Sequence, residues 1–345
     1  MDKIITIGMD IAKNVFQIHG VDVAGTVSLR RQLKRGEVLK FFSKQPPCLI
    51  GIEACGTSHH WARQITNLGH EVRLLQPAQV KAYVKPGKKN DAVDAEAICE
   101  AVSRPRLRTV PIKSEEQQGI LILHRTRDLL VRQRTMLINA LRGHMAEFGL
   151  VSGQGRGNFV KLLECLNGEE GAVIPQAAGT ALRQIAGQIN DADGRIVVLE
   201  KEIVARHRAC EASRNLATIP GIGPIIASAI AAAVPDPSVF KTGRDFAAWL
   251  GLVPRQNSTG GKTSLGPITK TGDRYIRRLL VIGATGLIRY KRENVPGGLE
   301  WVTKLLAKKP VRLVTVALAN KMARVAWAVL SSQEVYREKL GALPA

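Results

Sequence analysis

Four acidic residues have the types and the spacing that could hold a divalent cation. Asp10 ends the apolar run IITIGMD, and Glu53 ends a second run, CLIGIE. Asp91 and Asp94 follow in KKNDAVDAEAI, and their spacing places both carboxylates on one face of a helix. Ionised, convergent oxygen ligands of this kind suit Mg²⁺. Singly, each acid is better explained as a turn, cap or solvated strand end, so the prediction depends on all four together.

A hydroxyl group is the second candidate for chemistry. Ser258 lies in PRQNSTGGKTSLGPITKTGDRYIRRLL, where the glycines predict a mobile loop, and Arg255 and Lys262 are within four residues. A serine there could attack a phosphodiester, because cations stabilise the charge that develops on the phosphorus oxygens. Local sequence alone favours an ordinary turn residue. Thr259 and Ser264 are the alternative hydroxyls.

Hydrophobic alternation predicts the elements that must position the acids. The expected strands are residues 3–9, 15–23 and 26–33, CLIGIEA and EVRLLQP. The expected helices are residues 36–44, HHWARQITNLG and DAVDAEAICEAVSR. The order βββαβαβα is that of an RNase H-like α/β domain. It places Asp10 on the first strand, Glu53 on the fourth and the two aspartates on the last helix.

The middle of the chain is predicted to be helical. Residues 114–148 carry one apolar face, and residues 182–203 repeat apolar side chains in a heptad pattern. This predicts a helical hairpin or coiled coil, formed either within one chain or between two. We expect four parts: an α/β domain (1–113), the helical hairpin (114–212), a mainly α-helical domain (213–300) and a helical tail (301–345).

Two features of the third part predict nucleic-acid binding. Gly221-Ile222-Gly223 between apolar helical runs resembles a helix-hairpin-helix, whose glycines let backbone N–H groups approach a phosphate; a tight interhelical turn is the alternative. Residues 241–292 form the most basic stretch, in which the only acids are Asp245 and Asp273. The candidate binding residues are Gly221, Gly223, Arg255, Lys262, Lys270, Arg274, Arg277 and Arg278.

Composition sets wider bounds. The 345 residues carry a net charge of +21, which favours a polyanionic partner, nucleic acid before membrane. The five cysteines form no CxxC pair and indicate reduced thiols. No signal peptide is expected, and charged residues interrupt the apolar stretch 311–330, which predicts a buried helix. We therefore expect a cytoplasmic protein.

The motifs together resemble the DEDD transposases of insertion sequences, the family that includes the Piv and MooV invertases. The resemblance is carried by Asp10 in GMDIAK, Glu53 in GIEACG, and Asp91 and Asp94 in KNDAVDAEAI. The second half contributes IPGIGPIIA, FAAWLGLVPRQNSTGGK and ITKTGDRYIRRLL.

This resemblance implies more than the residues show. The first domain would resemble RuvC resolvase and bind Mg²⁺ through the four acids, which would be catalytic together with Ser258, the nucleophile in a transposase domain. The partners would be donor and target double-stranded DNA, a structured noncoding guide RNA (a bridge RNA), and further subunits in a homodimer or homotetramer. The competing hypotheses are a RuvC-like metal-dependent nuclease without a covalent intermediate, an actin-like ATPase or sugar kinase, and a non-catalytic nucleic-acid scaffold. A covalent protein–DNA adduct would separate the first two hypotheses.

Overall fold

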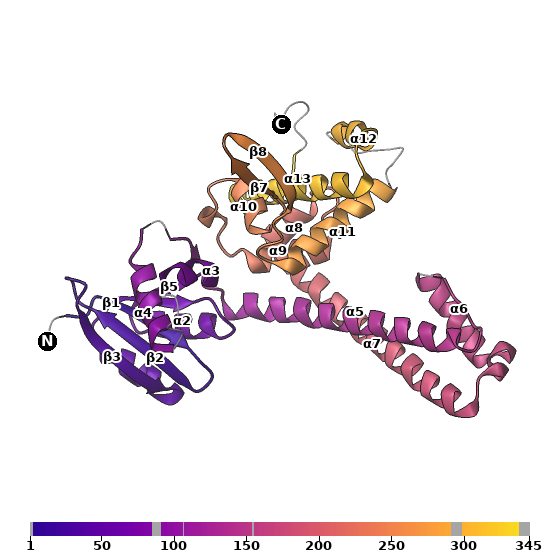
Figure 1. Ribbon diagram of the computed structural model, residues 1–345, viewed down its shortest axis with the longest axis horizontal. Helices are drawn as coiled ribbons and strands as arrows, with labels where there is room; N and C mark the ends of the chain where they lie inside the picture. The colour runs from indigo at the N-terminus through magenta and orange to yellow at the C-terminus, as the bar shows by residue number, and fades with distance from the viewer. Residues whose placement is uncertain (1–2, 85–90, 106, 154, 291–298, 338–345) are drawn as a thin grey trace. The chain divides into compact units, whose positions relative to one another are not determined.

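The computed structural model describes residues 3–84, 91–105, 107–153, 155–290 and 299–337. The chain divides into two compact units (Figure 1). Unit 1 contains Met1–Glu115 and Val234–Lys241, and unit 2 contains Glu116–Ala233 and Thr242–Ala345. A mixed α/β sheet at the N-terminus is therefore followed by a mostly helical second part.

Unit 1 is built on a six-stranded mixed sheet in the order β3-β2-β1-β4-β5-β6. The strands are β1 (Thr6–Ile11), β2 (Val15–Val21), β3 (Val27–Lys34), β4 (Leu49–Glu53), β5 (Glu71–Leu75) and β6 (Thr109–Val110). The helices are α1 (Val38–Phe42), α2 (Ser58–Thr66), α3 (Pro77–Val80) and α4 (Asp91–Val102), with 3₁₀ turns at Arg35–Glu37, Lys81–Tyr83 and Pro237–Val239. Strand β1 pairs antiparallel with β2 and parallel with β4. The five expected strands are confirmed, and β6 is an addition that the sequence pattern did not reveal.

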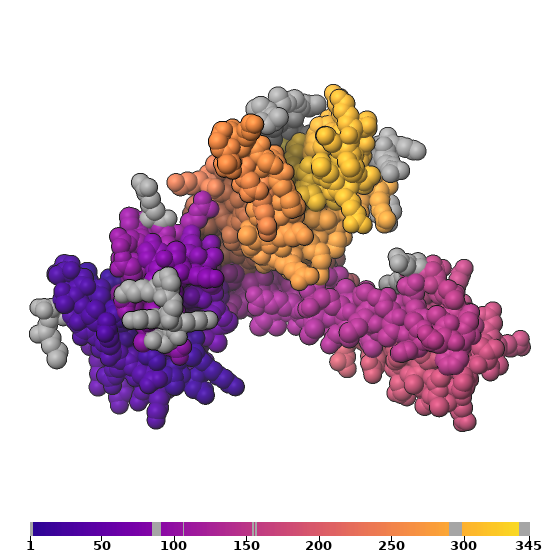
Figure 2. All heavy atoms as spheres, in the orientation of Figure 1, coloured from indigo at the N-terminus to yellow at the C-terminus, as the bar shows by residue number. Residues whose placement is uncertain are grey.

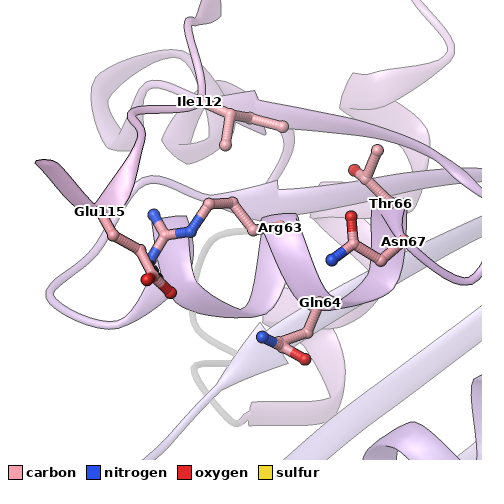
Figure 3. A pocket seen from close by; sticks show the side chains of 6 residues that line it. All are labelled: Arg63, Gln64, Thr66, Asn67, Ile112 and Glu115. Carbon is pink, nitrogen blue, oxygen red and sulfur yellow. Dashed lines mark ion pairs between the residues drawn. The ribbon is translucent and has the colours of Figure 1, made fainter. Parts of the chain in front are cut away.

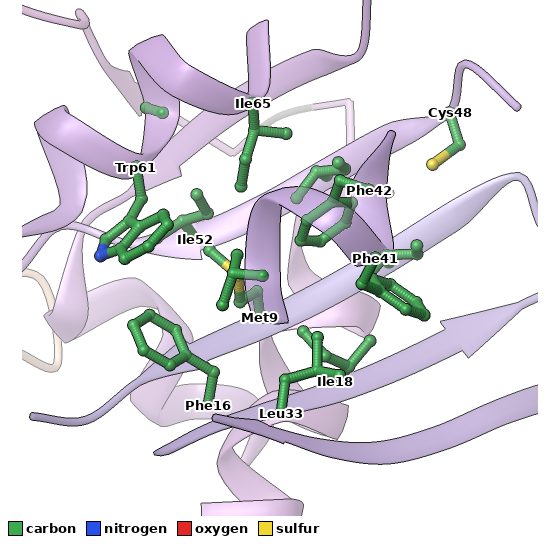
Figure 4. Close-up of a cluster of buried hydrophobic side chains, with 14 of the residues drawn as sticks. Met9, Phe16, Ile18, Leu33, Phe41, Phe42, Cys48, Ile52, Trp61 and Ile65 are labelled. Carbon is green, nitrogen blue, oxygen red and sulfur yellow. The ribbon is translucent and has the colours of Figure 1, made fainter. Parts of the chain in front are cut away.

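The larger hydrophobic core of unit 1 lies between the sheet and helices α1 and α2. Met9 of β1 and Ile52 of β4 are fully buried there beside Phe16 and Trp61 (Figure 4). The rings of Phe16 and Trp61 meet edge to face with centroids 5.0 Å apart. Because side chains alternate between the two faces of a strand, the neighbours of Met9 and Ile52 face the opposite side of the sheet.

Unit 2 begins with long helices. Helix α5 (Glu115–Ala146) and α7 (Gln176–Ala209) run antiparallel, because Arg127 pairs with Glu200 and Arg134 with Asp193. Helix α6 (Arg156–Asn167) and a 3₁₀ turn (Glu169–Val173) lie between them in sequence. The heptad residues Leu182, Ile189, Ile196 and Ile203 are buried within the chain. The expected helical hairpin is therefore formed intramolecularly.

The remainder of unit 2 is a helical domain with one β-hairpin. Its elements are α8 (Glu211–Ala217), α9 (Pro224–Ala233), α10 (Gly243–Trp249), β7 (Pro254–Thr259), β8 (Lys262–Ile268), α11 (Arg274–Tyr290), α12 (Glu300–Leu306) and α13 (Val311–Ser332). Helix α13 is long and apolar enough to cross a membrane, but half of its most apolar stretch is buried against the rest of the protein. It packs on α10 and α11, as expected for a core helix.

A buried polar network joins the long helix α5 to this domain. His124 of α5 is fully buried, and its two ring nitrogens lie 3.1 Å from the hydroxyls of Tyr275 on α11 and Ser228 on α9. Burial lowers the pKa of His124 to about 4, with a smaller contribution from Arg127. The imidazole is therefore neutral at pH 7 and connects the three helices through these two polar contacts.

Candidate active site

Asp10 and Glu53 lie beside each other on neighbouring parallel strands. Met9 of β1 is in register with Ile52 of β4, so the next residues of the two strands, Asp10 and Glu53, reach the same edge of the sheet. Both are partly exposed. Because Met9 and Ile52 point into the core, the two carboxylates point to the other face.

Helix α4 lies directly on that face because two glycines make room for it. Gly8 and Gly51 are paired in register, and each precedes its acid by two residues. A Cβ atom on Gly8 would overlap the carbonyl of Ala95 and stand 2.7 Å from the Cβ of Cys99. A Cβ atom on Gly51 would stand 2.7 Å from the Cβ of Val102. The pattern glycine-x-acid, present in both strands, therefore sets how closely α4 approaches the sheet.

The close approach of α4 brings Asp91 and Asp94, in its first turn, into electrostatic contact with the strand acids. The pKa of Asp10 is raised to about 6, first by burial and then by repulsion from Asp94, Asp91 and Glu53. Burial and repulsion from Asp94 also raise the pKa of Glu53. We refer to these four acids as the acidic face.

The acidic face has the chemistry of a cation site without the compact geometry of one. Within the part of the chain that the structure describes, no three His, Cys, Asp or Glu side chains are arranged to hold a metal ion. The expected convergence to coordination distance therefore stays a prediction. The donor set nevertheless fits a hard divalent cation, since all four groups offer carboxylate oxygens and a cation would offset the repulsion that raises the pKa of Asp10.

Ser258 lies in a β-strand, which corrects the expectation of a mobile loop. It belongs to β7 and pairs with Thr263 of β8. The two strands are joined by Gly260 and Gly261, both with positive φ (57° and 78°), which a tight hairpin turn of this kind requires. Every residue of β7 is exposed, and Figure 2 shows the orange atoms of this segment on the surface of unit 2. We refer to β7 and β8 as the serine hairpin.

The register of the serine hairpin separates Ser258 from Lys262, one of the two cations that were expected to assist it. Lys262 pairs with Thr259, so these two side chains share a face of the hairpin, and Ser258 points to the other face. Ser264 pairs with Asn257 and therefore also lies on the face of Lys262. The nearby cation Lys262 consequently favours the two alternative hydroxyls rather than Ser258.

The base of the serine hairpin is tightly packed. A Cβ atom on Gly272 would overlap the carbonyl of Trp249, and the N–H of Lys270 donates to the carbonyl of Gly251 at 3.1 Å. Lys270 itself has φ 57°, a backbone conformation that side-chain-bearing residues rarely adopt. The hairpin therefore projects from a close crossing of residues 249–251 and residues 270–272.

Arg277 holds this crossing together and is not a surface cation. Its guanidinium is buried and donates to the carbonyls of Leu250 at 2.8 Å and Thr271 at 2.6 Å. Arg278 is also engaged, since it pairs with Asp128 and stacks over the ring of Tyr275. The sequence cannot distinguish these two arginines from phosphate-binding ones. The exposed candidates are Arg255, Lys262, Lys270 and Arg274.

The glycine turn before α9 is used partly for packing. Gly221 has φ 83°, and a Cβ atom on Gly283 of α11 would overlap the carbonyl of Gly221. Gly223 has open space around it and directly precedes α9, which begins at Pro224. A phosphate contact at this turn is therefore open to Gly223, while Gly221 is occupied by helix packing.

A further cleft of about 420 Å³ lies elsewhere on unit 1, beside α2 (Figure 3). Arg63 crosses it, pairing with Glu115 at 3.7 Å and donating to the carbonyl of Lys113 at 2.6 Å. His59 is tied to the same segment, because its Nδ1 accepts a hydrogen bond from the Lys113 backbone N–H. These contacts fasten α2 to the end of unit 1, and none of the four acids lines the cleft.

Comparison with known proteins identifies the family. Residues 7–149 match a DEDD-type transposase family, and residues 213–295 match the transposase IS116/IS110/IS902 family. A probable family 20 transposase of Pseudomonas aeruginosa is 50% identical over 332 residues, which cover 96% of this chain and 98% of the relative. The chain belongs to the IS110/IS116 family of DEDD-type transposases.

Other members of this transposase family match over nearly the full length. A putative transposase of Sinorhizobium fredii is 46% identical, covering 99% of this chain and 88% of the relative. The transposase for insertion sequence element IS1328 of Yersinia enterocolitica is 39% identical, covering 97% and 99%. The segment matched by the DEDD-type family, residues 7–149, contains the acidic face. The segment matched by the IS116/IS110/IS902 family, residues 213–295, contains the serine hairpin. A transposase cuts and rejoins DNA, so DNA is its substrate.

Proposed function

We propose that this transposase cuts DNA through a covalent phosphoserine intermediate, with the acidic face as its Mg²⁺ site and Ser258 as its nucleophile. The observation that carries the proposal is the gathering of four carboxylates beside one another by β1, β4 and α4 in a chain of this family. The strand order β3-β2-β1-β4-β5 and the position of α4 support an RNase H-like domain.

The four acids Asp10, Glu53, Asp91 and Asp94 would hold the cation, which when bound stabilises negative charge on the phosphate oxygens. The Ser258 hydroxyl would attack phosphorus, forming a serine–phosphate ester while one bond of the DNA phosphodiester breaks. The serine proton passes to a base and the departing DNA oxygen takes up a proton. Rejoining reverses this, with a strand hydroxyl displacing serine, so the number of phosphoester bonds is conserved.

Ser258 needs a base that its own hairpin does not offer. Its cross-strand partner is Thr263, and its neighbours along β7 are Asn257 and Thr259, none of which is a base near neutral pH. The proposal therefore includes docking of the serine hairpin onto an acidic face, within one chain or between subunits of a dimer or tetramer. The net charge of +21 suits simultaneous binding of DNA and of a structured guide RNA.

A second candidate function is a metal-dependent nuclease in which water cuts the DNA. The observation favouring it is that Ser258 and the nearby cation Lys262 lie on opposite faces of the serine hairpin. In that case the acidic face alone performs the cleavage, and no covalent adduct forms.

Cleavage by the purified full chain in Mg²⁺ tests the role of the acidic face. Asp10→Asn, Glu53→Gln and Asp94→Asn should each lower the cleavage rate about a hundredfold or more while leaving DNA binding within a few-fold. The matched control is Glu100→Gln, on the exposed side of α4 where Glu100 pairs with Arg104. Wild-type cleavage by Asp10→Asn would refute the assignment.

A further inference from the structure

A polar groove of about 360 Å³ opens beside the acidic face, on the same side of the sheet. Its strand wall is formed by β2 and β3 and its other wall by the start of α4. The polar side chains that line it include Gln17, His19, Arg30 and Gln32 from the strands and Glu96 from the helix. All of them belong to unit 1, and the mechanism above uses none of them.

The strand register ties this groove directly to the acids. Asp10 pairs with Gln17, and Gln17 pairs with Gln32, so the three side chains form one row across β1, β2 and β3. Cross-strand partners point to the same face, and adjacent strands lie about 4.8 Å apart. Gln17 and Gln32 therefore lie one and two strands away from Asp10, about 5 and 10 Å between strand axes.

The next row carries the positive charge. Gly8 pairs with His19, and His19 pairs with Arg30, which is exposed at the edge strand β3. Burial lowers the pKa of His19, against the opposing influence of Glu96, and Arg30 lowers it further. Arg30 thus supplies a permanent cation in this row, and Glu96 is the carboxylate that lines the groove.

We propose that this groove binds the sugar–phosphate backbone of the DNA strand next to the phosphate that is cut. Amide N–H groups and a guanidinium are the donors that phosphate oxygens require. The amides lie in the row that starts at Asp10, and the guanidinium lies in the next row, which starts at Gly8, two residues before Asp10. This continuity with the cutting site favours DNA over the guide RNA as the occupant. The inference rests on the proposed function, because it takes the acidic face as the place of cleavage.

The groove also predicts an unfavourable contact within the site. Glu96 faces the same space as Arg30 and repels a bound phosphate. Replacing Glu96 with Gln should therefore tighten DNA binding, whereas replacing Arg30 with Glu should weaken it. Loss of a negative charge and reversal of a positive charge shift DNA binding in opposite directions by Coulomb's law alone, so a matched charge change away from the groove is the control that locates the site.

Equilibrium DNA binding by the full chain tests the proposal, using a labelled duplex that carries the cut site and a single-stranded end. Arg30→Glu should weaken binding about tenfold and lower the log–log salt slope by about 0.9 per lost duplex contact, or about 0.7 on single strands. Glu96→Gln should tighten binding about twofold. The matched control is Lys40→Glu, an equal charge change at an exposed residue of α1, on the opposite face of the sheet.

Ethylation interference on the same DNA shows which phosphates the groove contacts. Arg30→Glu should remove interference at one or two phosphates adjoining the cut phosphate and leave the others unchanged. Equal weakening by Arg30→Glu and Lys40→Glu, or weakening of guide-RNA binding alone, would overturn the groove as a DNA site. Failure of the wild-type protein to cut through a serine adduct would instead count against the proposed function, and the binding difference between the two variants would be unaffected.

Discussion

The acidic face is fixed by elements that are far apart in sequence, whereas Ser258 depends on contacts within one β-hairpin. Asp10 and Glu53 sit on strands whose opposite sides fill a core, and α4 is seated on two glycines between them. Ser258 lies on a ribbon whose β7 residues are all exposed and whose support comes from its base. Isolated two-stranded ribbons are marginally stable in water.

The two regions therefore differ in what holds their functional side chains in place. The packing of unit 1 holds the four carboxylates close enough to repel one another. The serine hairpin instead presents hydroxyl groups on both of its faces. Changes to the packing should therefore damage the acidic face, while changes to the base should damage the hairpin.

The largest effect is expected from Gly8→Ala. The added methyl group overlaps the backbone of α4 at Ala95, and a helix backbone cannot move aside cheaply. Unit 1 should lose about 3 kcal/mol or more of folding free energy, together with its cleavage activity. Thermal unfolding followed by circular dichroism measures the loss. Gly36→Ala is the control, since a Cβ atom there meets open space, and equal stability of the two variants would contradict the packing account.

A smaller loss is expected from Arg277→Met. The change removes the buried donor that serves the carbonyls of Leu250 and Thr271 and should cost about 2 to 3 kcal/mol. Its counterpart is Arg274→Ala on the same helix, an exposed residue whose loss should weaken DNA binding and leave stability nearly unchanged. Chemical denaturation and DNA titration of both variants would separate the roles. Similar stability losses in the two would show that Arg277 does not support the hairpin base.

The smallest effect is a gain in stability. The pKa of Asp10 is about 6 in the folded protein and near 3.8 in the unfolded chain, so its ionisation destabilises the metal-free fold progressively as pH rises above 3.8 and fully above about 6. Asp10→Asn should therefore raise stability at pH 7.5 by roughly 1 kcal/mol, a figure reduced for the partial exposure of the group. The gain should shrink as pH falls below 6 and vanish below about 3.8. Denaturant titrations in EDTA check this, and a loss of stability at pH 7.5 would show that the acids do not repel.

The sequence predicted the strands, the last helix and the order of the acids, because apolar alternation and spacing are local signals. It did not predict how close α4 lies to the sheet, although the repeated glycine-x-acid pattern, in Gly8-Met9-Asp10 and Gly51-Ile52-Glu53, carried that signal. Arg277 and Arg278 could not be recognised as residues with partners inside the protein, because nothing adjacent in sequence reveals the carbonyls and the aspartate that they bind. The serine hairpin was missed because its exposed strands have no apolar face.

Trapping the reaction on a nicked suicide DNA is the most direct test of the proposed mechanism. In Mg²⁺ the full-length protein should form a covalent protein–DNA adduct that survives a denaturing gel. Mass spectrometry should map the attachment to Ser258. Ser258→Ala should bind the same DNA with unchanged affinity and form neither adduct nor cut strand. An adduct on Thr259 or Ser264, or complete strand cleavage by Ser258→Ala, would contradict the account.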